Sequence, residues 1–183
     1  PKYIAGIIDT LTLQPDDIIL EIGPGKGALT RELAARVRQV IAVEIDPGLS
    51  AALENKIHRP ANLTVINADF LQLSPAQLNE LTDNVPGKGL KIIGNIPYYI
   101  TSPIIQKIFT LPQWAVAVLT VQKEVAERIV AVPGNKKYGI LSIAVQIKSQ
   151  AELVMTIPAT AFRPVPQVDS AVVKLVRLVP AKI

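Results

Sequence analysis

Short apolar runs alternate along this chain with stretches whose apolar residues recur at helical spacing, and this alternation restricts the fold more than any other feature. The first run, residues 18–22 (IILEI), leads through several glycines into residues 27–37, where leucine and valine share one helical face. Further β-rich runs follow at residues 40–45 and 63–66. Strand, helix and strand in succession form a βαβ unit, so the pattern predicts an α/β fold with a mainly parallel sheet and helices on both faces.

The later part of the chain continues the alternation. A helix is expected to open at Pro47 and to run to about Ile57. Other expected helices cover residues 101–109 and 123–131, and other expected strands cover residues 90–94, 115–121, 152–157 and 171–178. Residues 141–147 alternate like a strand, although a covering helix also suits the topology, and periodicity does not decide between the two.

Composition limits the classes of protein to which the chain can belong. Its 183 residues fit a single domain, no stretch reaches the 18 or so apolar residues of a membrane helix, and the N-terminus lacks a secretory signal. The absence of cysteine, with His58 as the single histidine, leaves no basis for a metal site or a Cys/His nucleophile. A net charge of +4 favours a polyanionic partner such as RNA, and a cytoplasmic location is expected.

The glycines after the first strand predict a cofactor site. In a parallel sheet, ligands bind at the carboxyl ends of the strands, where glycine lets a ligand approach the backbone. Gly23-x-Gly25-x-x-Ala28 fits the dinucleotide fingerprint, so the loop alone suits a nicotinamide cofactor, S-adenosylmethionine, or a turn with no ligand. Glu44 ends the second strand and is placed to accept hydrogen bonds from both ribose hydroxyls, which raises the odds of a cofactor.

The third strand closes on a second candidate acceptor. Asp69 follows Ala68 and precedes Phe70, so its carboxylate can accept a hydrogen bond from the adenine amine of a cofactor while apolar neighbours cover the ring. Three strand ends in series that carry glycines, Glu44 and Asp69 form a more specific set than any one of them.

Asn95-Ile96-Pro97-Tyr98 directly follows the fourth strand and predicts a site for a planar amine. The amine of a nucleobase is a poor nucleophile because its lone pair is delocalised into the ring. The Asn95 side chain and the Ile96 carbonyl can accept its two hydrogens and so favour a pyramidal, nucleophilic nitrogen, while Tyr98 stacks on the base. The four residues look like the motif of amine methyltransferases.

Together these motifs resemble those of the ribosomal RNA adenine dimethyltransferase family. Longer segments carry the same resemblance, namely residues 121–128 (VQKEVAER), 138–142 (YGILS) and 162–173 (FRPVPQVDSAVV). The resemblance implies a Rossmann-like, class I S-adenosylmethionine-dependent methyltransferase with a seven-stranded sheet. It implies that the cofactor is held by Glu21, Gly23, Gly25, Glu44, Ile45, Ala68, Asp69, Phe70 and Asn95. It also implies that the target adenine is held by Asn95, Ile96, Pro97 and Tyr98, with Phe162 stacked on its other face.

The family resemblance implies N6-dimethylation of two adjacent adenosines near the 3′ end of small-subunit (16S) ribosomal RNA, during ribosome biogenesis. The expected partner is that RNA in the small subunit or its precursor, and a monomer is expected. Alternatives are a large-subunit (23S) methyltransferase of the macrolide-resistance type, a DNA adenine methyltransferase, a nicotinamide-dependent oxidoreductase, and a non-catalytic relative that binds RNA or DNA. Family members usually begin with a basic, Gln-Asn-Phe-Leu-like segment and end in a helical domain, so residues 1–183 are expected to form a catalytic-domain fragment.

Basic residues around the predicted site are candidates for contacts with RNA. They are Lys123, Arg128, Lys136, Lys137 and Arg163. Solvation of a helix face explains Lys123 and Arg128 equally well, whereas Lys136 and Lys137 follow a Pro-Gly-Asn turn and are better placed for phosphate.

Overall fold

A seven-stranded sheet forms the centre of the protein in a computed structural model that describes residues 2–55, 60–82 and 89–178. The strands are β1 (Ile18–Ile22), β2 (Gln39–Glu44), β3 (Leu63–Asn67), β4 (Leu90–Asn95), β5 (Trp114–Gln122), β6 (Ser149–Ile157) and β7 (Ser170–Arg177). These are the seven strands expected from the sequence, with ends that shift by a few residues. The mainly parallel α/β fold is therefore confirmed.

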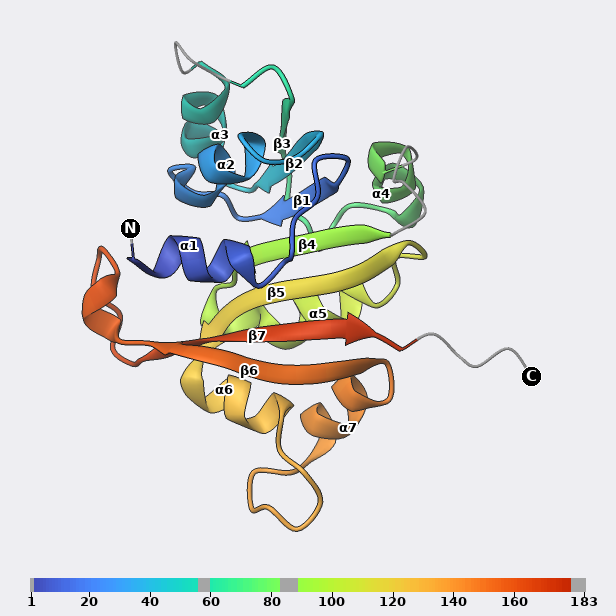
Figure 1. Cartoon of the computed structure of the whole chain (residues 1–183), viewed down its shortest axis with the longest axis vertical. Helices are drawn as coiled ribbons and strands as arrows, with labels where there is room; N and C mark the ends of the chain where they lie inside the picture. The colour runs from blue at the N-terminus through green and yellow to red at the C-terminus, as the bar shows by residue number, and fades with distance from the viewer. Residues whose placement is uncertain (1, 56–59, 83–88, 179–183) are drawn as a thin grey trace.

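The order of the strands decides where a ligand can bind. Across the sheet the order is β3-β2-β1-β4-β5-β7-β6, with β7 antiparallel to both of its neighbours and the first five strands parallel (Figure 1). The chain proceeds outward from β1 to β3 on one side and then returns to lie beside β1 as β4. Such a reversal opens a crevice at the carboxyl ends of the two central strands, which is the usual ligand position in this fold class.

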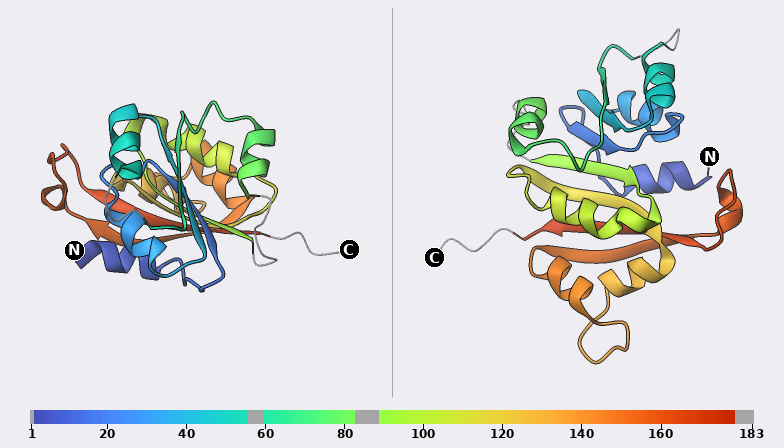
Figure 2. Two further views of the ribbon diagram at one scale, coloured as in Figure 1. Left: turned by 90° about the horizontal axis from the view of Figure 1, so that it is seen from above. Right: turned by 180° about the vertical axis from the view of Figure 1, so that it is seen from behind.

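Helices cover both faces of the sheet (Figures 1 and 2). The helices are α1 (Lys2–Asp9), α2 (Ala28–Ala34), α3 (Pro47–Glu54), α4 (Pro75–Thr82), α5 (Thr101–Ile108), α6 (Lys123–Ile129) and α7 (Ile140–Gln146). Helix α3 contacts β2 and β3. Side chains of α1 and α2 join one apolar core, and those of α4 to α7 join a second core on the opposite face. Each strand contributes side chains to both cores because successive side chains of a strand point to opposite faces.

The alternating run at residues 141–147 is helical in the structure. Leu141 and Val145, one helical turn apart, pack in the core under α7, whereas Ile140, Ile143 and Ile147 are exposed. The helix therefore has apolar residues on two sides. Because of this, the sequence shows an apparent alternation in place of the 3.6-residue period of a helix with one apolar face.

Two helices, α1 and α4, were not expected. The start of α4 carries a reciprocal pair of hydrogen bonds, in which Ser74 N donates to Gln77 Oε1 at 2.8 Å and Gln77 N donates to Ser74 Oγ at 3.2 Å. A Ser-x-x-Gln capping box was thus a readable signal for this helix. The expected end of the third helix near Ile57, and His58, lie outside the described residues.

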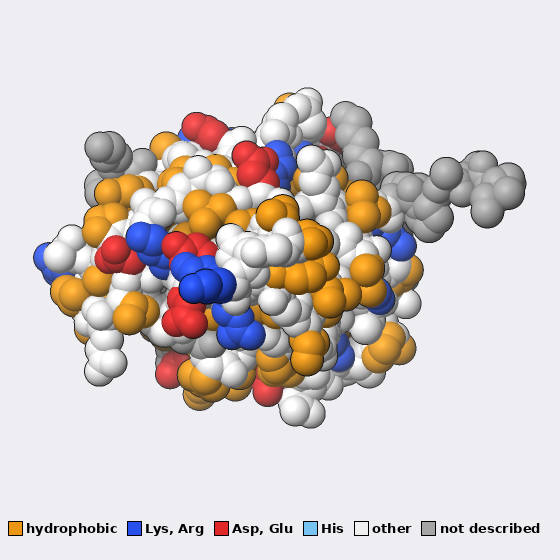
Figure 3. Space-filling model, turned by 90° about the horizontal axis from the view of Figure 1, so that it is seen from below, with side chains coloured by type: hydrophobic (Ala, Val, Ile, Leu, Met, Phe, Trp, Pro, Cys, Tyr) orange, Lys and Arg blue, Asp and Glu red, His pale blue; other side chains and the backbone are white. Residues whose placement is uncertain are grey.

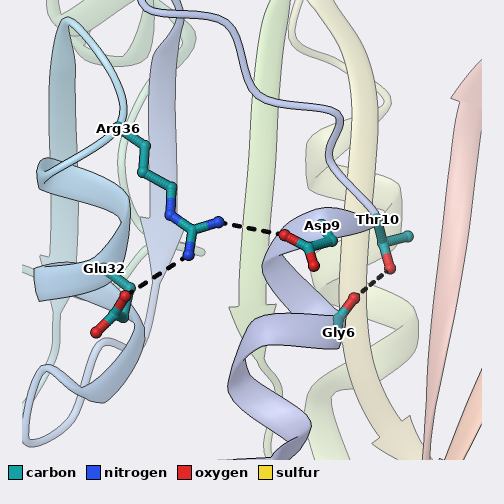
Figure 4. Close-up of polar contacts among 5 residues, drawn as sticks. All are labelled: Gly6, Asp9, Thr10, Glu32 and Arg36. Carbon is teal, nitrogen blue, oxygen red and sulfur yellow. Dashed lines mark hydrogen bonds and ion pairs between the residues drawn. The ribbon is translucent and has the colours of Figure 1, made fainter.

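Polar contacts fix α1 against the remainder of the fold. Arg36, after α2, pairs with Asp9 of α1 at 3.2 Å and with Glu32 at 3.7 Å (Figure 4). In the loop after α1, Asp17 pairs with Lys91 of β4 at 2.6 Å, and this pair is buried. An exposed ion pair contributes little to stability, whereas the buried one becomes costly if either partner is lost.

The face formed by α6, α7 and their connecting loop carries charges of both signs beside a group of apolar side chains (Figure 3). Ile140 and Ile143 of α7, and Ile147 directly after it, are exposed. Among the helices that the structure describes, none has the length and apolar character needed to cross a membrane.

Candidate active site

The glycine loop lies at the carboxyl end of β1, directly beside the end of β4. Gly23 N donates to Val43 O at 2.9 Å, which extends the pairing of β1 with β2 past the end of the strand. Gly23 and Gly25 have φ values of 67° and 56°, a region that strongly favours glycine. A Cβ added at Gly25 would meet no atom within 4 Å, so the backbone here faces open space into which a ligand can approach.

Glu44 is a buried carboxylate at the end of β2, and both of its oxygens accept hydrogen bonds from the backbone. Gly25 N donates to Oε2 at 2.9 Å, and Asp46 N donates to Oε1 at 3.0 Å. Each carboxylate oxygen has a second lone pair, so the fixed carboxylate keeps acceptor capacity for two hydroxyl groups. The carboxylate lies beside the glycine loop, where the sequence predicts a residue that binds ribose.

Asp69 follows β3 and is oriented by a local hydrogen bond. Leu71 N donates to its Oδ1 at 2.9 Å, and the side chain is half-buried. Ala68 N donates to Glu44 O at 3.0 Å, which holds the loop after β3 against the end of β2. The carboxylates of Glu44 and Asp69 therefore belong to neighbouring strand ends, and both line one cavity.

This first cavity has a volume of about 220 Å³. Seven of the residues that the sequence predicted for a cofactor line it, namely Gly23, Glu44, Ile45, Ala68, Asp69, Phe70 and Asn95. Pro97 and the apolar residues Ile22, Val43, Ile100 and Ile104 complete the lining and were not assigned to the cofactor from the sequence. Ile22 and Val43 are part of the apolar runs of β1 and β2, in which a pocket-lining residue has the same appearance as a core residue.

Two predicted cofactor residues do not line this cavity. Gly25 lies beside it through the bond to Glu44, whereas Glu21 is 1% exposed, on the face of the sheet that α2 covers. Burial, together with the nearby charge of Glu44, raises the pKa of Glu21 to about 7, and the Thr30 side chain partly opposes this shift. Glu21 Oε2 and Thr30 Oγ1 have no hydrogen-bond partner of normal geometry, so the carboxyl group lies in a weakly solvating environment.

Asn95, the last residue of β4, lines a second cavity as well as the first. The second cavity has a volume of about 430 Å³ and is lined by Asn95, Ile96, Pro97, Tyr99, Phe162, Arg163, Pro164 and Pro166. Ile96 N donates to Thr120 O at 2.9 Å and its side chain is buried, so the backbone of the motif is anchored to β5. Asn95 thus stands where the two cavities meet.

Phe162 reaches this site from a distant part of the sequence, the loop between β6 and β7. This loop projects at the carboxyl edge of the sheet, beside the N-terminal end of α1 (Figure 1). Phe162 also lines a third cavity of about 260 Å³, under α1 and α2, together with Asn95 and Arg163. The side chain of Tyr98 lies outside the described residues; its backbone begins a short 3₁₀ helix, Tyr98–Ile100.

The predicted basic residues are divided between two regions. Arg163 lines the second cavity, and Lys123 begins α6 at the same edge of the sheet, where its N–H donates to Asp169 O at 3.0 Å. Lys136 and Lys137 lie in the loop between α6 and α7, at the bottom of Figure 1 and far from the cavities. Lys137 pairs with Glu127, and this contact lowers the pKa of Glu127. Arg128, on α6, is exposed.

In the described part of the chain, no group of three or more His, Cys, Asp and Glu side chains is arranged to hold a metal ion. The site therefore consists of glycine backbone, two carboxylates, one amide and aromatic residues. Such a set suits an adenosine-containing ligand and a planar amine.

Known proteins are similar to this chain in both sequence and fold. The family model described as "Ribosomal RNA adenine dimethylase" matches residues 1–181. Proteins named "Ribosomal RNA small subunit methyltransferase A" from Acaryochloris marina and Leuconostoc citreum are 44% and 41% identical over 92% and 98% of the chain. The chain spans 63% and 61% of their respective lengths.

Solved structures of ribosomal RNA and adenosine methyltransferases also superpose on this chain. A dimethyladenosine transferase from Plasmodium falciparum superposes with a TM-score of 0.85 at 32% identity, covering 97% of this chain and 62% of its own. The 23S rRNA methyltransferase ErmE superposes with a TM-score of 0.83 at 38% identity, covering 97% of this chain and 68% of its own. Both are similar over almost all of the sheet and helices described above.

Proposed function

The chain belongs to the ribosomal RNA adenine dimethylase family, and from this we propose that it transfers methyl groups from S-adenosylmethionine to N6 of two adjacent adenosines near the 3′ end of 16S ribosomal RNA. The observation that carries the proposal is the position of Asn95, which lines both the first and the second cavity. The names of the curated relatives support the small subunit as the substrate. The curated relatives are longer than this chain, which spans 63% and 61% of their lengths.

The first cavity fits the adenosine part of the cofactor. Glu44, fixed beside the glycine loop, accepts hydrogen bonds from the ribose hydroxyls. Asp69 accepts a hydrogen bond from the adenine amine, and Ile45 and Phe70 cover the adenine ring. A volume of about 220 Å³ lies below the usual range for a whole ligand, so the remainder of the cofactor extends over the open backbone at Gly25.

The second cavity receives the target adenine. Asn95 Oδ1 and the Ile96 carbonyl accept the two hydrogens of the amine, which directs its lone pair out of the ring plane. Phe162 stacks on one face of the base and Tyr98 on the other, the arrangement expected for a base turned out of its RNA strand.

When bound, S-adenosylmethionine would supply a methyl group whose bond to sulfur breaks as the bond to the amine nitrogen forms, so that sulfur leaves as a neutral sulfide. The methylated nitrogen then carries the positive charge and releases a proton to solvent, which needs no strong base. The residues of this chain contribute position and polarisation. Asn95 orients the nitrogen toward the first cavity, and the apolar lining excludes water from the path between the two ligands.

The decisive experiment supplies labelled methyl donor and unmodified small and large ribosomal subunits to the full-length protein, and then maps the labelled bases. Two adjacent dimethyladenosines in the small-subunit RNA are the expected product. Label confined to the large subunit would instead support the second candidate, a 23S methyltransferase, which the similarity to ErmE favours. Donor binding without transfer to either RNA would refute both enzymatic proposals.

A further inference from the structure

Tyr99 presents an aromatic ring to solvent at the mouth of the second cavity. It follows the Asn95–Tyr98 motif, lies in the short 3₁₀ helix and is 86% exposed. Among the described residues, it is the aromatic member of the exposed large hydrophobic side chains. A tyrosine in this position buries little of its own surface, so packing within the chain does not account for it.

Arg163 borders the same cavity from the loop between β6 and β7. Its Nη1 donates to Thr160 O at 3.1 Å and to Phe162 O at 2.9 Å, which ties one end of the guanidinium to the loop backbone. A guanidinium carries five N–H donors in a rigid fork, so an anchored arginine retains donors for an anion. The cavity thus combines an exposed ring with a positioned cation.

The cavity is larger than one base requires. Its volume of about 430 Å³ falls in the range of pockets that bury a drug-sized ligand, and roughly doubles the 220 Å³ of the first cavity. The proposed function assigns Asn95, Ile96 and Phe162 to the target adenine, which leaves Tyr99 and Arg163 without a role in holding that base.

We propose that Tyr99 and Arg163 form a subsite for the nucleotide next to the target adenosine, with the neighbouring base stacked on Tyr99 and its phosphate bound by Arg163. The inference rests on the proposed function and adds a determinant of RNA context to it. Single-stranded RNA is recognised by such stacking on aromatic rings, combined with cationic contacts to the backbone. An exposed ring beside an anchored cation matches that chemistry.

The test uses short RNAs that contain the target adenosine and an abasic site at either the 5′ or the 3′ neighbour. With the wild-type protein, removal of one of these two bases should lower kcat/KM about tenfold, which corresponds to about 1.4 kcal/mol of stacking. Tyr99→Ala should show the same tenfold loss on intact RNA and no further loss on the abasic RNA. Tyr99→Phe, which keeps the ring, should behave as the wild type.

A matched control and a second variant separate stacking from damage to the fold. Ile140→Ala removes an equally exposed side chain on α7, 88% exposed, and should leave both RNAs unaffected. Arg163→Gln should reduce the salt dependence of RNA binding by about one phosphate contact. Affinity for S-adenosylmethionine should stay within twofold of the wild type in every variant.

The outcomes distinguish this inference from the proposed function. Suppose that the wild type methylates RNA, and that an abasic site at either neighbour lowers kcat/KM by the same factor in Tyr99→Ala as in the wild type. The flanking-base subsite is then refuted and the proposed function stands. If the wild type transfers no methyl group to any RNA, the proposed function fails and the subsite fails with it.

Discussion

Glu44 Oε2 accepts a hydrogen bond from Gly25 N at 2.9 Å, so the carboxylate that ends β2 holds the glycine loop that ends β1. One side chain therefore shapes the cofactor loop and also faces the cavity in which the ribose is proposed to bind. This double role leads to a first prediction.

Glu44→Gln should weaken binding of S-adenosylmethionine by about 1.5–3 kcal/mol, the usual value of a hydrogen bond to a charged group. Titration calorimetry measures the loss directly. Glu54→Gln, at an exposed carboxylate that ends α3, is the matched control and should bind the donor as the wild type does. Unchanged affinity of the Glu44 variant would exclude the proposed ribose contact.

Asn95→Ala should lower the rate of methyl transfer by about 10²–10³, because one preorganised polar contact to the reacting nitrogen is lost. Single-turnover kinetics with saturating donor and RNA isolate this step from binding. Asn135→Ala, in the loop between α6 and α7, removes an asparagine far from the cavities and should leave the rate unchanged. Full activity of the Asn95 variant would remove the proposed polarisation of the amine.

Glu21 should make the stability of the fold depend on pH. Burial raises its pKa from 4.5 to about 7, so the folded chain holds this proton more tightly than the unfolded chain does. Its contribution to stability is complete below pH 4.5 and is lost as the pH rises through about 7. The full loss amounts to about 3 kcal/mol.

Glu21→Gln should remove this contribution, because the amide cannot ionise. Urea unfolding of the wild type and the variant between pH 4.5 and pH 8 measures the difference in unfolding free energy. As the pH rises, the unfolding free energy of the wild type should fall relative to that of the variant. A difference that is independent of pH would show that the Glu21 carboxyl group is not held in its protonated form by the fold.

Lys91→Met should destabilise the fold by about 3–5 kcal/mol, because it leaves the Asp17 carboxylate buried without its cation. The double variant Lys91→Met/Asp17→Leu should recover part of that loss, since both charges are then removed. Arg36→Gln breaks the exposed pair with Asp9 shown in Figure 4 and should cost no more than about 1 kcal/mol. Equal effects of Lys91→Met and Arg36→Gln in urea unfolding would contradict this account.

Much of the fold could be predicted because a strand has a local signature. Residues 18–22 are buried at all five positions, and four of the five are apolar, as is typical of a central parallel strand. The identities of the residues at the strand ends also predicted the first cavity, because parallel strands place Gly23, Glu44, Asp69 and Asn95 at one edge. Periodicity did not decide between a strand and a helix for α7, since its apolar residues lie both in the core and on the surface.

The sequence by itself determined the succession of the seven strands and the residues of the strand-end motifs, because periodicity and turn chemistry are properties of neighbouring residues. The family resemblance implied that Phe162 lies at the site, but only the tertiary structure decided that Tyr99 lines the same cavity as Phe162 and Arg163, and that Lys136 and Lys137 lie far from it. These relations depend on how β7 inserts between β5 and β6 and on how the loop between β6 and β7 returns to the edge of the sheet. Contacts between residues so far apart along the chain are set by packing of the whole sheet, and no local pattern encodes them.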